Sequence, residues 1–312
     1  MPLWRRGKGT WTSRMSGLSE HSWAIVCVTP ALSLLAVFAA IPILQAVWLS
    51  LHARLPMFGI DRFIGLANYQ ALLQDARVWA AFGTTAYFTA VSVALEVGLG
   101  LGMALLAYGG SDFRRGPQTS ALRVIMLVPW AVPSVVSARI WEWLYHPDYG
   151  VVNYLLSAAG VIEHPIYWLG TPTWSIHAAI LMDVWKTTPF AALILLAGLH
   201  TIPEELYQAA RVDGASGWQT FRRITLPLLW PALLIVLTFR TMDAFRVFDA
   251  VYVLTGGGPG NSTETLSIYA YKTLFHTLQF GYGSAVTTVM FLIVSCVTAV
   301  YLLALRRRLE LA

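Results

Sequence analysis

Residues 202–227 read IPEELYQAARVDGASGWQTFRRITLP, a polar segment between two long apolar stretches. The chain as a whole is 57% hydrophobic and only 12% charged, whereas soluble proteins hold about 25% charged residues. A chain this apolar cannot cover a water-facing surface, so we expect most of its exterior to contact lipid. The segment is then one of the few places where the protein meets water and other proteins.

Six apolar stretches each have the length to cross a hydrocarbon core of about 30 Å as a helix. The sequence therefore predicts an all-α polytopic membrane protein, with a tail at residues 1–22 and one transmembrane domain at residues 23–312. The first stretch is too long for a cleaved signal peptide, so we expect it to remain as an anchor. The expected spans are residues 23–51, 82–108, 121–145, 176–199, 228–254 and 284–305.

Lysine and arginine residues gather on one side of the expected membrane. Thirteen of them fall in the two ends of the chain, in the loop between the second and third spans and in the 202–227 loop. The other side has four, namely Arg54, Arg62, Arg77 and Lys272. Because basic loops stay in the cytoplasm, both termini and the 202–227 loop are predicted to be cytoplasmic, and residues 254–281 to form an outer loop.

Other kinds of chemistry find little support in the sequence. Cys27 and Cys296 lie inside apolar runs and are expected to be small buried residues rather than a disulfide. The phosphate-binding pattern G-x-x-x-x-G-K-[ST] is absent, so ATP is expected on a partner. The histidines are scattered and predict no metal site. The positions of the basic residues explain the net charge of +5 better than nucleic-acid binding does.

Two short helices are predicted within the 202–227 loop. Gly214 is a natural end for the first helix. Ser216 and Gln219 form a capping-box pattern at the start of the second. Such a pair could sit as a rigid knob in a groove of a partner. An amphipathic loop that lies on the membrane surface is the alternative that the spacing leaves open.

The same loop carries a resemblance to a known family. Ala209 and Ala210, then Gly214 after three residues and Ile-Thr-Leu-Pro at 224–227 after nine more, resemble the coupling-loop signature of ABC importer permeases. The whole segment is similar to their carbohydrate-uptake branch, the maltose-type permeases, although Gln208 stands where that family has a glutamate. The resemblance implies a type I permease fold and a surface, with both alanines exposed, that docks on an ATPase. The coupling residues are then Glu205, Gln208, Ala209, Ala210, Asp213, Gly214, Leu226 and Pro227.

Further segments extend the resemblance over nearly the whole chain. FIGLANYQALLQD (63–75) and LVPWAVPSVVSARIWEWLY (127–145) resemble sugar permeases. DVWKTTPFAALILLAGL (183–199) and FRTMDAFRVFD (239–249) resemble the larger permease subunit of actinobacterial trehalose importers. VYVLTGGGPGNSTETL (251–266) looks like the family's outer loop, which implies that it meets a binding protein. The implied docking residues are Gly256, Gly257, Gly258, Pro259 and Asn261.

Ionisable residues within the spans mark the expected substrate path, since charges are costly in lipid. Sugar hydroxyls need hydrogen-bonding groups, and sugar ring faces need an aromatic wall. Asp183 with Lys186, and Asp243 with both Arg240 and Arg246, are spaced to lie on one helix face, and structural salt bridges are the alternative. Combined with the resemblance, the expected path is Trp130, Ser134, Asp183, Lys186, Thr187, Phe190, Asp243 and Arg246; Glu96 is a further charge within a span.

Small residues and prolines give two more expectations for the spans. Gly98 and Gly102 are four residues apart, a pattern of close helix packing. Pro129 and Pro133 are expected to break the third span, and Pro189 the fourth.

We therefore expect a permease subunit of an ATP-driven sugar importer in the plasma membrane of a bacterium, working by alternating access. Trehalose is the first substrate expected and maltose-like α-glucosides are the second. The expected partners are a second permease, two ATPase subunits that hold ATP and Mg, an extracytoplasmic sugar-binding protein, expected to be a lipoprotein, and lipid. An ion-coupled secondary transporter is the alternative, but it usually has more spans and an inverted repeat. A membrane enzyme is a second alternative. It would need a clustered nucleophile or metal set, which the sequence lacks.

Overall fold

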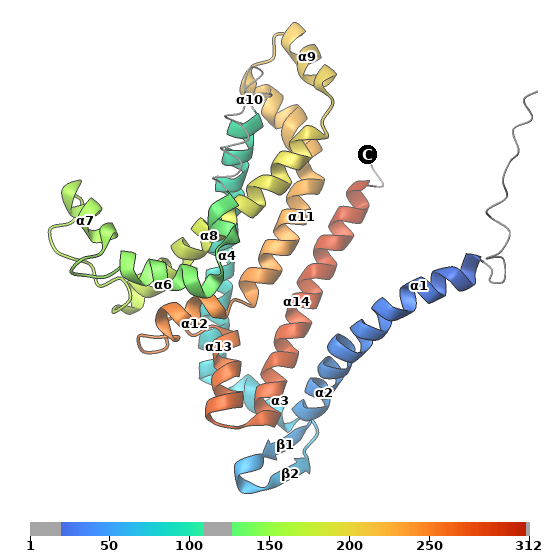
Figure 1. Cartoon of the computed structure of the whole chain (residues 1–312), viewed down its shortest axis with the longest axis vertical. Helices are drawn as coiled ribbons and strands as arrows, with labels where there is room; N and C mark the ends of the chain where they lie inside the picture. Colours follow the sequence, from blue (N-terminus) through green and yellow to red (C-terminus); the bar gives the residue numbers. More distant parts are fainter. Residues whose placement is uncertain (1–19, 109–126, 310–312) are drawn as a thin grey trace, which may run out of the picture.

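The computed structural model describes residues 20–108 and 127–309, which form long helices with a small hairpin at one end (Figure 1). The chain starts with α1 (Glu20–Leu35) and α2 (Ile41–Ser50), joined by a π-helical turn. An antiparallel hairpin of β1 (His52–Leu55) and β2 (Ile60–Phe63) follows. This hairpin is a small departure from the all-α expectation. Most of the tail predicted at residues 1–22 lies outside the described residues.

The longest helices match the expected spans. They are α4 (Ala76–Tyr108), α8 (Pro172–His200) and α14 (Phe280–Leu309). The fifth expected span begins as predicted with α11 (Leu226–Phe245) but ends earlier, because the helix is interrupted before α12 (Asp249–Thr255).

Within the described residues, five segments are long and apolar enough to cross a membrane. The third expected span falls partly on residues 109–126, outside the described ranges. Its remainder forms a helical turn at 127–131 and then α6 (Ser134–Leu144). The count of six spans therefore stays a prediction.

The two ends of the bundle differ in character (Figure 1). One end carries α9 (Glu204–Val212) and α10 (Gly217–Thr220), and we call it the knob end. The other, the hairpin end, holds β1, β2, α3 (Ala67–Gln74) and α13 (Leu266–Tyr271). Helix α14 runs from the hairpin end towards the knob end, while α6 and the short helix α7 (Val151–Ala158) extend to one side.

The core of the bundle is the contact between α4 and α8, against which α11 also packs. Gly100 makes the close approach possible, since an added Cβ there would lie 2.9 Å from Cβ of Ala191. Gly98 and Gly102 do not pack closely within this chain, because neither would place a Cβ within 4 Å of another residue. Residues two positions away from Gly100 point to a different side of the helix.

The proline predictions are partly confirmed. Pro133 precedes α6 as its N-cap, so the chain does break there. Pro129 lies inside the helical turn at 127–131 and does not interrupt it. Pro189 lies within α8, which continues on both sides. Buried residues before and after Pro189 hold α8 in the core, so the lost hydrogen bond does not end the helix.

The cysteine prediction was wrong in one respect. Cys27 and Cys296 are free thiols, but both are exposed on this chain rather than buried. Their helices, α1 and α14, carry many exposed apolar side chains, which is the expected state of helices that face lipid or another subunit.

Candidate functional site

Charged side chains from three helices meet inside the bundle. Glu96 comes from α4, Asp183 from α8 and Arg240 from α11. Glu96 is 0% exposed and Arg240 3% exposed, and Asp183 is also buried. Asp243, one turn after Arg240, completes the group, which we call the central ion cluster.

Arg240 lies at the centre of this cluster and donates to all three carboxylates. Its Nε and Nη2 bind the two carboxylate oxygens of Glu96, with Nη2 at 3.0 Å from Oε1. Nη1 lies 2.7 Å from Asp243 and Nη2 lies 3.4 Å from Asp183. Thr187 also donates to Glu96 at 2.7 Å. Breaking a buried pair of this kind costs about 3–5 kcal/mol, because one charge is left without its partner.

One face of the cluster is accessible. The side chain of Asp243 is 55% exposed and that of Arg246 is 65% exposed, with Arg246 Nη2 at 3.8 Å from Asp243 Oδ1. Lys186 is partly exposed in the middle of α8. Exposed charges at such positions are costly in hydrocarbon. This face therefore meets water or another polar chain rather than lipid.

Aromatic side chains lie near the same helices. The rings of Trp130 and Phe190 are stacked with centroids 5.8 Å apart and an interplanar angle of 18°. Phe190 also meets Phe239 of α11 edge-on. Ser134, at the start of α6, is partly exposed. The two aromatic residues expected to line the path are thus in contact with each other.

The structure differs from the sequence prediction in how the charges pair. Asp183 was expected on one face with Lys186, but its ion-pair partner is Arg240 on another helix. Thr187 is also buried against Glu96 rather than freely accessible. The pairs of Asp243 with Arg240 and with Arg246 are confirmed.

Glu96 and Arg240 were recognised as charges within the spans, but neither was included among the expected path residues. Glu96 carried a signal, because it is the one charged residue of residues 78–108, deep in an apolar span. Its partner lies 144 residues away in the chain and could not be recognised from spacing.

The knob consists of α9, α10 and the chain that leads into α11. Gly214 follows the end of α9 with φ of +71°, a conformation that glycine adopts without strain. The capping box is confirmed, with Ser216 N bound to Gln219 Oε1 at 2.8 Å and Gln219 N to Ser216 Oγ at 3.3 Å. The hydroxyls of Tyr207 and Thr225 lie 3.1 Å apart and tie α9 to the start of α11. These bonds support a knob that moves as one body.

Most of the predicted coupling residues lie on the surface of the knob. Ala210 is an exception, because it is buried against the protein rather than exposed to a neighbour. Sequence reasoning missed two apolar residues, Val212 and Trp218, which are 89% and 68% exposed. These two side chains add apolar surface to a knob that is otherwise largely polar. The exposed coupling residues are Glu205, Gln208, Ala209, Asp213, Gly214 and Pro227, and Leu226 is partly exposed.

The predicted docking loop lies at the hairpin end. Gly256 and Asn261 are exposed and have positive φ, whereas Gly257 is buried and Gly258 and Pro259 are partly buried. The hydroxyl of Thr263 donates to the carbonyl of Gly258 at 2.8 Å and fixes the loop. The next residue, Glu264, binds both Arg77 and Lys272 and so fastens the loop to the start of α4.

This fastening predicts a pH effect on stability. Burial opposes the ionisation of Glu264, but the hydrogen bonds and charges of Arg77 and Lys272 outweigh it and hold the pKa of Glu264 below its usual 4.5. The contribution is therefore present above pH 4.5 and is lost as the pH falls through the lower, folded-state pKa. We expect the thermal unfolding midpoint of Glu264→Gln to depend less on pH in this range than that of the wild type. Parallel curves in detergent would contradict this.

Long apolar helices that bury charges between them, with a helical knob at one end, define a polytopic membrane protein with a polar interior. The chain belongs to the family described as "Binding-protein-dependent transport system inner membrane component", which matches residues 96–310. It is a multi-pass membrane protein and the permease subunit of a sugar ABC importer, and it is not itself an enzyme.

Several named relatives cover most of the chain. It is 44% identical over 283 residues to the trehalose/maltose transport system permease protein MalF of Thermococcus litoralis, covering 91% of this chain and 93% of that protein. It is 40% identical to the sulfoquinovosyl glycerol transport system permease protein SmoG of Agrobacterium fabrum, covering 96% and 94%. It is 38% identical to the trehalose transport system permease protein SugA of Mycobacterium tuberculosis (strain ATCC 25618 / H37Rv), covering 92% and 90%.

Solved structures agree on the fold. The chain matches one from a bacterial ABC transporter involved in the import of the acidic polysaccharide alginate, with a TM-score of 0.78, 23% identity and coverage of 92% of this chain and 96% of that chain. A second match, with a TM-score of 0.73, 21% identity and coverage of 90% and 93%, is the alginate transporter in complex with an alginate pentasaccharide-bound periplasmic protein. The expected type I importer permease fold is confirmed.

Proposed function

We propose that this chain forms half of the translocation path for a disaccharide, trehalose first and maltose-like α-glucosides second. The accessible charges Lys186, Asp243 and Arg246 support the proposal most directly, because they need a polar space beside α8 and α11. Their mixture of donors and acceptors suits sugar hydroxyls. Trp130 and Phe190 supply an apolar surface for a sugar ring.

The other half of the path comes from a second, homologous permease. Two ATPase subunits hold ATP and Mg and receive the knob in a groove, and a sugar-binding lipoprotein docks at the hairpin end. The complex lies in the plasma membrane of a bacterium, with both termini of this chain and the knob in the cytoplasm. Closure of the ATPases on ATP moves the knobs and opens the path outward.

Alternating access requires ATP to bind one conformer of the transporter more tightly than the other. ATP must favour one conformer over the other by about 10⁴-fold to move the population from 1:99 to 99:1. The rigid contacts within the knob support this role, since a flexible loop would absorb the motion before it reached the spans.

The test is the ATPase rate of the reconstituted complex with its binding protein across a panel of sugars. We expect stimulation by trehalose, weaker stimulation by maltose and none by lactose. Stimulation by sulfoquinovosyl glycerol instead would reject the disaccharide, and the cations Lys186 and Arg246 would suit its sulfonate. Uptake driven by a proton gradient, with no ATPase copurifying, would reject the importer mechanism in favour of an ion-coupled transporter.

A further inference from the structure

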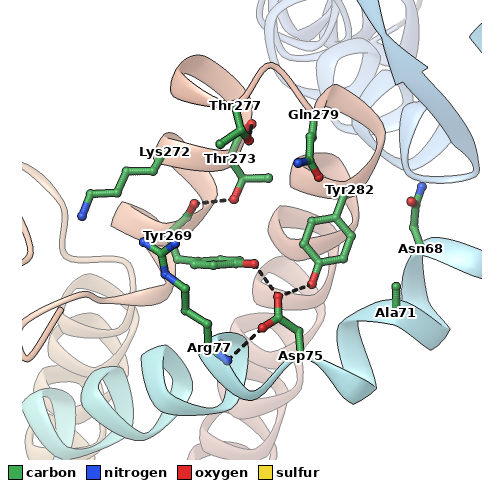
Figure 2. Close-up of a pocket in the computed structure, with 10 residues that line it drawn as sticks. All are labelled: Asn68, Ala71, Asp75, Arg77, Tyr269, Lys272, Thr273, Thr277, Gln279 and Tyr282. Atoms are coloured by element: carbon green, nitrogen blue, oxygen red, sulfur yellow. Dashed lines mark hydrogen bonds between the residues drawn. The ribbon is translucent and has the colours of Figure 1, made fainter. Parts of the chain in front are cut away.

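A polar cavity of about 500 Å³ lies at the hairpin end, away from the central ion cluster. It forms where the corner between α3 and α4 meets α13, the turn after it and the start of α14 (Figure 2). Its volume falls in the range of about 300–1,000 Å³ that is usual for small-molecule sites. The cavity, which we call the outer pocket, is lined by Asn68, Ala71, Asp75, Arg77, Tyr269, Lys272, Thr273, Thr277, Gln279 and Tyr282.

The acidic side chains around the outer pocket already have hydrogen-bond partners within the protein. Asp75 Oδ2 accepts hydrogen bonds from the hydroxyls of Tyr269 and Tyr282 at 2.6 and 2.8 Å, and Oδ1 accepts one from the Arg77 amide (Figure 2). Burial opposes the ionisation of Asp75, but these bonds outweigh it and keep its pKa below the usual value. Behind the wall, Glu264 is nearly fully buried and accepts from both Arg77 and Lys272. The walls are therefore held in place without a ligand.

The hydrogen-bonding groups that remain point to a neutral, hydroxyl-rich ligand. Within the described residues, no partner is found for Oδ1 of Asn68 or for Nη1 of Arg77. These atoms include both donors and acceptors. The two cations are balanced by two carboxylates, so an anion would find no net positive charge. Tyrosine rings in the wall add apolar surface for a sugar ring.

We propose that the outer pocket is a second saccharide-binding site on this chain and takes a neutral mono- or disaccharide. It is distinct from the central ion cluster, because Arg77 and Glu96 are separated along α4 by about 28 Å at the helical rise of 1.5 Å per residue. Only the choice of trehalose and maltose as probes rests on the proposed function. The site itself depends only on the residues that line the pocket.

Protection of a cysteine placed in the wall tests the proposal. Gln279→Cys is made in a chain that also carries Cys27→Ser and Cys296→Ser, because both native thiols are exposed. The assembled transporter, without binding protein, is placed in nanodiscs of phosphatidylethanolamine and phosphatidylglycerol, which contain no glycolipid. We expect trehalose or maltose to slow maleimide labelling of the Gln279→Cys variant in a saturable way.

Two further variants localise the effect. Gln70→Cys lies on the exposed surface of α3 outside the pocket, so its labelling should not respond to sugar. Ala71→Trp fills the cavity without removing a polar group and should abolish the protection at position 279. Asp243→Ala, in the central ion cluster, should leave the protection unchanged even if it stops transport.

Each outcome decides the proposal. Labelling of the Gln279→Cys variant at the same rate with and without both sugars would overturn it. Protection by glucuronate but not by neutral sugars would also overturn it, because the pocket would then be an anion site. Saturable protection that disappears with Ala71→Trp would support the site even if the ATPase assay rejected the proposed transport function.

Discussion

Replacement of Arg240 by methionine should abolish sugar uptake. The substitution leaves Glu96, Asp183 and Asp243 around an apolar side chain, with Glu96 wholly buried. Leaving a buried charge without its partner costs about 3–5 kcal/mol, and about 1.4 kcal/mol is a factor of ten in an equilibrium constant. We therefore expect the equilibrium constant for native packing of α4, α8 and α11 to fall by about 100-fold or more. Uptake of labelled trehalose should be lost in vesicles that contain the whole transporter.

A second substitution separates folding from function. The pair Glu96→Gln with Arg240→Met removes both charges of the bidentate contact, so assembly with the ATPase subunits should recover relative to Arg240→Met alone. Uptake should stay low, because Asp183 and Asp243 have lost the guanidinium that orients them. If Arg240→Met transports normally, or if the double variant recovers uptake fully, the cluster has no role in positioning these carboxylates.

Replacement of Gly214 by aspartate should abolish uptake while the protein stays inserted in the membrane. Gly214 has φ of +71°, where most residues with a side chain are strained by about 1–2 kcal/mol and aspartate by less. The new carboxylate would also lie beside Asp213 at the carboxyl end of α9, where the helix dipole disfavours negative charge. These costs fall on an exposed part of the knob, so the spans should be unaffected.

The measurement for Gly214→Asp is sugar-stimulated ATPase activity together with copurification of the ATPase subunits. Gly217→Asp is the matched control, because it adds the same charge to the same knob at the first residue of α10, where a negative charge is favourable. We expect the control to keep much of its activity. Normal ATP-coupled uptake by the Gly214→Asp variant would reject docking of the knob on the ATPase.

In the knob, local sequence signals predicted the helix ends and caps but not which side chains are exposed. The glycine stop, the capping box and both short helices were predicted correctly, because each depends on residues within one or two turns. The exposure of Ala210 was predicted wrongly, because it depends on which side of α9 packs against the rest of the chain. Val212 and Trp218 were missed for the same reason.

For the spans, too, the sequence predicted some features correctly and missed others. Hydrophobic length alone placed α4, α8 and α14 within six residues of their observed bounds, since a membrane helix must be long and apolar wherever it packs. It could not place the interruption between α11 and α12, because charged residues there are spaced as they would be on one continuous helix face.

The sequence by itself determined the membrane class, the expected orientation, the knob and the family resemblance, because these follow from composition and from motifs of neighbouring residues. Only the tertiary structure decided which charges pair. Arg240 meets Glu96 and Asp183 because α4, α8 and α11 pack together, and Arg77 meets Glu264 across 187 residues of chain. Contacts of this kind depend on how helices rotate and approach one another, and no local spacing encodes that geometry.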